Sequence, residues 1–397
     1  MSSYTSYPQQ FSVDFSFQLL CTRDAFQPGN DTLLEALAHP AGRPARCLVF
    51  VDAGVLKADP GLEQRILRWF TANGSDCQLA ASPEAIAPGE AAKRDLAIVE
   101  RIGALCLEHG ICRHSYIIAI GGGAVLDAVG LGAALTHRGV RLIRMPTTVL
   151  AQDDAGLGVK NGVNAFGNKN FFGTFAVPHA IINDSAFLDR LPQREWRAGI
   201  AEAVKVAIIK DRSYLAWIAG AAPALASRDS EAMNELIRRC ALLHLEHITG
   251  AGDPFERGSS RPLDFGHWSA HRMEVLSKHR LNHGEAVAIG IALDLFYAAA
   301  IKRISTEERD AVLDTLEACG FHLWDEVLEL RSRDGKRTVL TGIEQFREHL
   351  GGELTLAMPD GLGQRADIHD FDDGLFEVCV RQLRSRVRAA RHGVVGG

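Results

Sequence analysis

The first half of the chain alternates short apolar runs with segments of helical spacing. The runs have the length and residue types of buried strands, and the segments between them repeat apolar residues every three to four positions. Strands are predicted at Phe11–Cys21, Cys47–Val51, Cys77–Ala81, Tyr116–Ile120 and Leu142–Met145, and helices at Glu63–Ala72 and Ala91–Glu108. This alternation predicts a Rossmann-like α/β domain, with a parallel sheet covered by helices on both faces.

From about Gln193 the pattern becomes almost entirely helical. We expect helices over Glu195–Lys210, Ser213–Ala222, Ser230–Thr249, His267–Ser277, Gly284–Ile301, Thr306–Cys319, Gly342–Leu350 and Asp373–Arg391. A chain of 397 residues is long enough for two domains, each with its own core. We therefore predict an α/β domain over residues 1–192 and a mostly α-helical domain over residues 193–397.

Polar and glycine residues follow the predicted strands at their carboxyl ends. Asp52 follows the first buried run, Gly121–Gly123 the next, and Thr147 and Thr148 the last. Ligands of parallel sheets bind at this edge. Glycines that lead into a helix let the backbone approach a phosphate, although many such turns use glycine only to reverse direction.

Composition narrows the classes of function. The formal net charge of −6 argues against a nucleic-acid partner. The eight cysteines form no CxxC pair, which favours reduced thiols in the cytoplasm over a disulfide framework. We recognise no run of about 18 apolar residues and no signal-peptide pattern in MSSYTSYPQQF, so neither a membrane span nor secretion is expected.

The second half contains a candidate metal site. Glu202 lies in a predicted helix, His267 and His271 are four residues apart on one helix face, and His283 opens the next helix. One carboxylate with two or three imidazoles is a ligand set for Zn²⁺, Co²⁺ or Fe²⁺ that leaves room for substrate oxygens. Surface or capping roles for these histidines are the alternative.

A long polar segment, Gln152–Gly173, joins the two halves. It combines glycines and amides with Lys160 and Lys169, a composition suited to an anionic substrate group. A loop of this length is more often functional than not, although a simple connection is possible.

Six segments together resemble one known family. They are GGGAVLD, RMPTTVLAQDDAGLGVKNGVN, GNKNFFGTF, AGIAEAVK, FGH…H and HGEAVAIG, and they occur in the same order between about Asp52 and Lys336. The chain resembles the sugar phosphate cyclase superfamily, whose archetype is 3-dehydroquinate synthase. The resemblance implies a dehydroquinate synthase-like fold, bound NAD, a Zn²⁺ or Co²⁺ ion, a sugar phosphate substrate and a homodimer.

The resemblance also implies roles for individual residues. Metal ligands would be Glu202, His267 and His283, with Lys205 as a catalytic lysine. NAD-binding positions would be Asp52, Glu90, Lys93, Gly121, Gly122, Gly123, Asp127, Thr147, Thr148, Asp154, Lys169 and Phe187. Catalytic or substrate-binding positions would be Asp154, Lys160, Lys169, Asn170, Glu256, Asp264, His271 and Lys336, with Arg138 donated to the phosphate by a neighbouring subunit.

The chain departs from dehydroquinate synthases just before His267. Ser260 and Asp264 stand where those enzymes carry an arginine and an asparagine that hold the substrate carboxylate region, while an arginine occurs one place later, at Arg261. Asp264 resembles 2-epi-5-epi-valiolone synthases, whose substrate is sedoheptulose 7-phosphate, whereas His271 is as in dehydroquinate synthases. The segment VKNGVNAFGNKNFFGTF also resembles the corresponding segment of cyclase-like proteins called EboD.

The predicted reaction is therefore the cyclisation of a C7 ketose phosphate such as sedoheptulose 7-phosphate. It would proceed by transient oxidation, phosphate elimination, re-reduction and aldol closure, which makes the enzyme a carbon–oxygen lyase. Three alternatives remain: 3-dehydroquinate synthase proper, a metal-dependent polyol or alcohol dehydrogenase, and a non-catalytic NAD-binding scaffold.

Overall fold

A seven-stranded parallel sheet organises the N-terminal half. The computed structural model describes residues 5–37, 43–166, 168–250, 253–255, 261–349 and 353–393. The strand order is β1-β9-β6-β5-β2-β3, with β4 also paired to β2, and every pairing within this sheet is parallel. The strands are β1 Gln18–Thr22, β2 Ala45–Asp52, β3 Cys77–Leu79, β4 Glu84–Ile86, β5 Tyr116–Gly121, β6 Arg141–Pro146 and β9 Ala180–Asp184.

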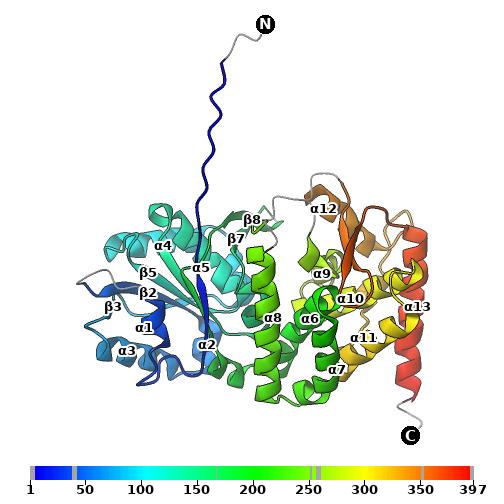
Figure 1. Ribbon diagram of the computed structural model, residues 1–397, viewed down its shortest axis with the longest axis horizontal. Helices are drawn as coiled ribbons and strands as arrows, with labels where there is room; N and C mark the ends of the chain where they lie inside the picture. Colours follow the sequence, from blue (N-terminus) through cyan, green and yellow to red (C-terminus); the bar gives the residue numbers. More distant parts are fainter. Residues whose placement is uncertain are drawn as a thin grey trace.

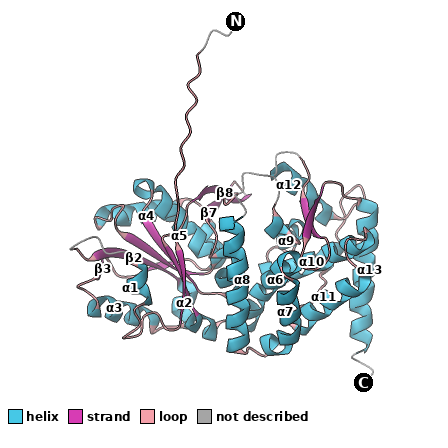
Figure 2. Cartoon of the chain, viewed as in Figure 1, coloured by secondary structure: helices cyan, strands magenta, loops and turns pink. Residues whose placement is uncertain are grey.

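Helices cover both faces of this sheet, as predicted. Alternate residues of β2 point to opposite sides: Val49 and Val51 join the core under α1 and α3, while Leu48 and Phe50 join the core under α4 and α5. Figure 2 shows these strands in one half of the molecule, flanked by helices. The helices are α1 Thr32–Ala36, α2 Ala53–Ala58, α3 Leu62–Ala72, α4 Ala97–Glu108 and α5 Gly123–Leu135, with short 3₁₀ helices η1 Gly89–Lys93, η2 Thr136–Arg138 and η4 Ser185–Arg190.

The C-terminal half is helical and lies beside the sheet (Figure 1). Its helices share one large apolar core. They are α6 Gln193–Lys210, α7 Arg212–Ala226, α8 Ser230–Gly250, α9 His267–Leu276, α10 His283–Ala300, α11 Thr306–Ala318, α12 Thr341–His349 and α13 Asp373–Gly393, with η5 Pro262–Asp264, η6 Glu326–Glu329 and η7 Thr338–Leu340. An antiparallel pair, β10 Leu356–Pro359 and β11 Arg365–Ile368, was not predicted.

Helix α10 corrects the expectation that no apolar stretch is long enough to cross a membrane. Its 18 residues reach a mean hydropathy of 1.2, which meets the length and composition of a span. However, 78% of this window is buried inside the protein. The glycines, alanines and aliphatic residues of α10 serve the core, which is why the helix is apolar all round.

The polar segment between the halves is also more regular than a loop. A π-helical turn, η3 Ala151–Ala155, precedes the antiparallel hairpin of β7 Lys160–Ala165 and β8 Asn168–Phe175. Strand β8 is exposed over most of its length, so no buried face imposes the alternation that would have revealed it. The strand expected over Phe11–Cys21 is shorter than predicted, since only Gln18–Thr22 pairs with the sheet.

A close contact fixes this hairpin against α5, and it can be tested. A Cβ atom on Gly130, inside α5, would lie 1.8 Å from Oδ1 of Asn161, which accepts a hydrogen bond of 2.7 Å from buried Arg144. We expect Gly130→Ala to lower the free energy of unfolding by about 1–3 kcal/mol, measured by denaturant titration.

Gly220 in α7 is the matched control, because a Cβ there meets nothing within 4 Å in the part of the chain that the structure describes. Gly220→Ala should be neutral or stabilise by up to about 1 kcal/mol, since alanine favours helix. Equal loss of stability in both variants would contradict the proposed contact.

Candidate active site

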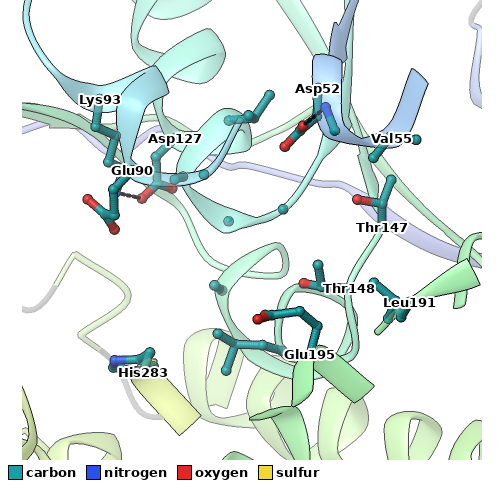
Figure 3. A pocket seen from close by; sticks show the side chains of 18 of the residues that line it. Asp52, Val55, Glu90, Lys93, Asp127, Thr147, Thr148, Leu191, Glu195 and His283 are labelled. Atoms are coloured by element: carbon teal, nitrogen blue, oxygen red, sulfur yellow. Dashed lines mark hydrogen bonds and ion pairs between the residues drawn. The ribbon is translucent and has the colours of Figure 1, made fainter. Parts of the chain in front are cut away.

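A cavity of about 1410 Å³ lies between the carboxyl edge of the sheet and the helical half. Its walls include residues from the ends of β2, β5 and β6, from the β7–β8 hairpin, and from α9, α10 and α12. Figure 3 shows Lys93 and Asp127 facing this space with His283 across it. The predicted positions that line it are Asp52, Glu90, Lys93, Gly122, Gly123, Asp127, Thr147, Thr148, Lys169, Asn170, Phe187, Asp264, His271 and His283.

The sheet side of the cavity has the features of a dinucleotide site. Asp52 ends β2 and caps α2, where its Oδ1 accepts a 2.7 Å hydrogen bond from the Gly54 amide. Burial raises the pKa of Asp52, although amides including that of Gly54 act in the opposite direction. Gly122 caps α5, so the amides of its first turn face the cavity that Gly122 and Gly123 line.

Lys93 connects three elements at this wall. Its Nζ lies 2.5 Å from Oδ2 of Asp127 on α5 and 2.8 Å from Oδ1 of Asn170 on β8. Lys93 is buried, so its charge is held close to these partners. The arrangement anchors the exposed hairpin beside the glycine turn.

Glu202, His267 and His283 meet on the opposite side of the cavity, where only His283 of the three lines the wall. Oε1 of Glu202, on α6, lies 3.4 Å from Nε2 of His267 and 3.2 Å from Nε2 of His283. The two histidines are the first residues of α9 and α10. Gly266 makes this approach possible, because it adopts a left-handed φ of 77° immediately before His267.

The chemistry of this cluster fits a divalent cation. Both carboxylate oxygens of Glu202 are buried and have no hydrogen bond of normal geometry among the described residues. Burial would raise the pKa of Glu202, but Lys205 and the two imidazoles hold it well below its usual range. Burial would likewise lower the pKa of His283, yet Glu202 and Glu274 raise it to about 10. A site that so strongly favours positive charge, with three ligand atoms within 4.8 Å of one another, suits an open zinc-type site.

Lys205 lies one helical turn after Glu202, is 1% exposed, and pairs with the Glu202 carboxylate. Burial opposes its charge, but Glu202 and Asp154 outweigh this and raise its pKa. Asp154, on η3, lies with Oδ1 3.0 Å from Nδ1 of His244. Burial would raise the pKa of Asp154, whereas Lys205 and His244 lower it to about 2. Lys205 therefore stays cationic beside two carboxylates.

Sequence reasoning missed Glu274. Its Oε2 lies 3.4 Å from Nδ1 of His283, and its Oε1 lies 3.3 Å from Nζ of Lys169. The spacing of His267, His271 and Glu274 along α9 (i, i+4, i+7) places all three on one helix face, which was a usable signal. Burial opposes ionisation of Glu274, but His283 and Lys169 lower its pKa to about 2.

His271 lines the cavity beside these groups. Although His271 is partly exposed, desolvation by the surrounding protein atoms, reinforced by His267 and His283, lowers its pKa to about 3. The imidazole is thus neutral at physiological pH, able to donate one hydrogen bond and accept another.

Several predicted residues do not reach the cavity in this single chain. Lys336 pairs with Asp373 on α13 at 2.7 Å and is 61% exposed. Lys160 begins β7 and Arg138 ends η2; both are exposed and, like Lys336, stand outside the cavity lining. Gly121, Asp154, Glu202, Lys205 and His267 lie behind the cavity wall rather than in it, and Glu256 and Ser260 fall outside the described residues.

Comparison with known proteins identifies the class. The chain matches the family profiles described as 3-dehydroquinate synthase N-terminal over residues 84–198 and 3-dehydroquinate synthase C-terminal over residues 199–337. The protein belongs to the 3-dehydroquinate synthase family, which confirms the fold and the family predicted from the sequence.

The relatives include both a 2-epi-5-epi-valiolone synthase and 3-dehydroquinate synthases. The chain is 34% identical over 302 residues to a 2-epi-5-epi-valiolone synthase of Streptomyces glaucescens, covering 75% of each protein. It is 34% identical over 294 residues to a 3-dehydroquinate synthase of Dichelobacter nodosus, covering 74% of this chain and 78% of that one. The solved structure of ValA, a 2-epi-5-epi-valiolone synthase from Streptomyces hygroscopicus with NAD⁺ and Zn²⁺ bound, superposes with a TM-score of 0.84 at 26% identity, covering 96% of this chain and all of that one.

The contact of Glu274 with His283 predicts a role in metal retention. Glu274→Gln removes the charge that orients the His283 ring, and such partners typically contribute about 10–100-fold to metal affinity. We expect a loss in this range when Zn²⁺ or Co²⁺ binding is measured by competition with a chelator.

Lys169→Met serves as the matched variant, since it removes the other partner of Glu274 but leaves the His283 contact. Its metal affinity should equal or exceed that of the wild type. A metal affinity of Glu274→Gln equal to that of the wild type would count against this role.

Proposed function

We propose that this protein is a sugar phosphate cyclase that uses bound NAD and a divalent metal, Zn²⁺ or Co²⁺, on a C7 ketose phosphate such as sedoheptulose 7-phosphate. The observation that supports this most directly is the placing of two features on opposite sides of one cavity. One is a glycine turn of the dinucleotide-binding kind, and the other is the group of Glu202, His267 and His283, which favours a bound cation. By its phosphate elimination the enzyme would be a carbon–oxygen lyase.

NAD and the metal would bind on opposite sides of the cavity. Asp52, the glycine turn, Asp127 and Thr147 would hold NAD, and Glu202, His267 and His283 would hold the metal. When bound, these two groups supply a reversible hydride acceptor and a Lewis acid for the substrate hydroxyl.

Side chains of the protein stabilise the charges that develop. The Lys205 ammonium, fixed beside Glu202 in a dry site, stabilises negative charge on the reacting oxygen. Lys169 carries positive charge into the cavity, which suits the substrate phosphate. Neutral His271 can donate a hydrogen bond to that phosphate.

Asp264 supports a substrate without a carboxylate. Asp264 and Arg261 both line the cavity, on the segment that precedes His267. A substrate carboxylate near Asp264 would meet a like charge, which is unfavourable in a partly dry site. Sedoheptulose 7-phosphate avoids this repulsion, whereas the substrate of 3-dehydroquinate synthase does not.

The proposal extends to assembly and location. Arg138 is exposed and outside its own cavity, as an arginine donated to a neighbouring subunit of a homodimer would be. All eight cysteines are free, which suits the reducing cytoplasm. The division into domains at residues 192 and 193 stays a prediction; all seven strands of the main sheet precede it.

Phosphate release tests the reaction. Purified protein with NAD⁺ and Zn²⁺ or Co²⁺ should release inorganic phosphate from sedoheptulose 7-phosphate without net NADH absorbance, because the hydride returns within each turnover. Faster release from 3-deoxy-arabino-heptulosonate 7-phosphate would instead assign 3-dehydroquinate synthase. Accumulating NADH would indicate a dehydrogenase, and no turnover of any C7 or C6 sugar phosphate would favour a scaffold.

Lys205→Met tests the assignment of charge stabilisation. Loss of a preorganised charge at the reacting oxygen should lower kcat by about 10²–10³-fold. NAD affinity, measured by fluorescence titration, should remain near that of the wild type because Lys205 lies on α6 beside Glu202, whereas the glycine turn starts α5. An unchanged kcat would remove Lys205 from the mechanism.

A further inference from the structure

The backbones of helices α6 and α10 approach each other closely beside the cluster of Glu202, His267 and His283. Glu202 belongs to α6, and His283 is the first residue of α10. A Cβ atom on Gly284 would lie 2.3 Å from the carbonyl oxygen of Ala198, so only glycine allows this approach without a shift. The contact sets how close the helices come, and the apolar side chains of both helices pack in the same core.

An ion pair also joins the two helices. Arg194, in the first turn of α6, donates to Glu285 of α10 through Nε at 2.8 Å and Nη2 at 2.5 Å. Nη2 of Arg194 also donates to the carbonyl oxygen of Arg280, just before α10. A guanidinium held by two parallel bonds fixes orientation as well as distance.

Glu285 also shapes the first turn of α10. The Asn282 amide donates to Oε2 of Glu285 at 3.1 Å, and the Glu285 amide donates to Oδ1 of Asn282 at 2.9 Å, which completes a capping box. His283 is the residue directly after this cap. One carboxylate therefore fixes the turn that carries His283 and binds the helix that carries Glu202.

We propose that Arg194 and Glu285 are a positioning pair that sets the mutual geometry of Glu202 and His283 for the metal. This inference rests on the proposed function, because it concerns the metal of that site. Neither residue is among the candidate ligands, so both act through the helices that they join. The side chains are 46% and 34% exposed, and pairs of that exposure add little to overall stability. Their effect is on metal affinity, because a small displacement of a ligand weakens metal binding.

Arg194→Gln is the cleanest test, since it leaves the Asn282–Glu285 capping box in place. We expect about tenfold weaker binding of Zn²⁺ and Co²⁺, a loss of the size seen for outer partners of metal ligands, measured by chelator competition. The visible absorption of the Co²⁺-loaded protein should also change, because it reports coordination geometry. The melting temperature of the metal-free protein should stay within ~2 °C of the wild type.

Two further variants make the test decisive. Arg194→Lys keeps the charge but not the paired bonds, so its metal affinity should be intermediate. Arg280→Gln is the matched control: it removes an ion pair of 2.8 Å with Asp325 next to the start of α10, a pair that does not join α6 to α10. Its metal affinity should match the wild type.

Wild-type affinity in Arg194→Gln, or an equal loss in Arg280→Gln, would overturn the inference, as would a wild-type protein that binds neither metal. If Arg194→Gln does not fold, the same criteria apply to Arg194→Lys. These titrations contain no sugar phosphate, so their outcome is separate from the proposed reaction. Protein that binds metal in an Arg194-dependent way but releases no phosphate would contradict the cyclase and leave the positioning pair intact.

Discussion

The buried carboxylate of Glu202 is the constraint around which the helical half is built. A charge removed from water is unfavourable unless it is paired, and Glu202 is fully buried. Its partners come from its own helix, as Lys205, and from the first residues of two later helices, as His267 and His283. The starts of α9 and α10 must therefore converge on the middle of α6, which places their amino ends at the cavity wall.

The sheet imposes the complementary constraint. Parallel strands end at one edge, so Asp52, the glycine turn and Thr147 arrive at the same wall although they are distant in sequence. The hairpin of β7 and β8 then crosses from this edge toward the helices, anchored by Lys93 through Asn170. The glycine turn and the cluster of Glu202, His267 and His283 lie on opposite sides of one cavity, because the parallel sheet and the converging helices each bring their polar groups together at one end.

Periodicity predicted most of the elements that have a buried face, although it missed the fully buried strand β9. Five strands of the main sheet and the eight long helices described in the C-terminal half follow from it, with ends displaced by a few residues, but β4 and β9 of that sheet were not predicted. It failed for β7 and β8, whose side chains are largely polar or exposed, and for most of Phe11–Cys21, which has the alternation of a strand but little pairing. The periodicity of apolar residues reflects burial, so a strand such as β8, which pairs with β7 but has no buried face, is not predicted by it.

The site was predicted unevenly for a related reason. Glu202, His267 and His283 come together as their residue types and the family resemblance suggested, although their role as ligands stays a prediction. Arg138 and Lys336 were placed by resemblance alone, and Lys160 by resemblance and by the composition of its segment; in a single chain all three lie outside the cavity lining. Glu274 was overlooked although its spacing places it on the helix face of His267 and His271, and the folded contacts with His283 and Lys169 show what it does there.

Lys169 shows how the two halves are coupled electrostatically. Its ammonium lies 3.3 Å from Glu274 on α9 and 3.9 Å from Glu90 on η1, so one carboxylate from each half competes for it. An anion that binds Lys169 has to displace at least part of this pairing, which a phosphate dianion does more effectively than a monoanionic group. Because Glu274 also contacts His283, the loss of Lys169 leaves that carboxylate to the imidazole. Lys169 on the hairpin and His283 of the Glu202 cluster are thereby linked through the one carboxylate of Glu274.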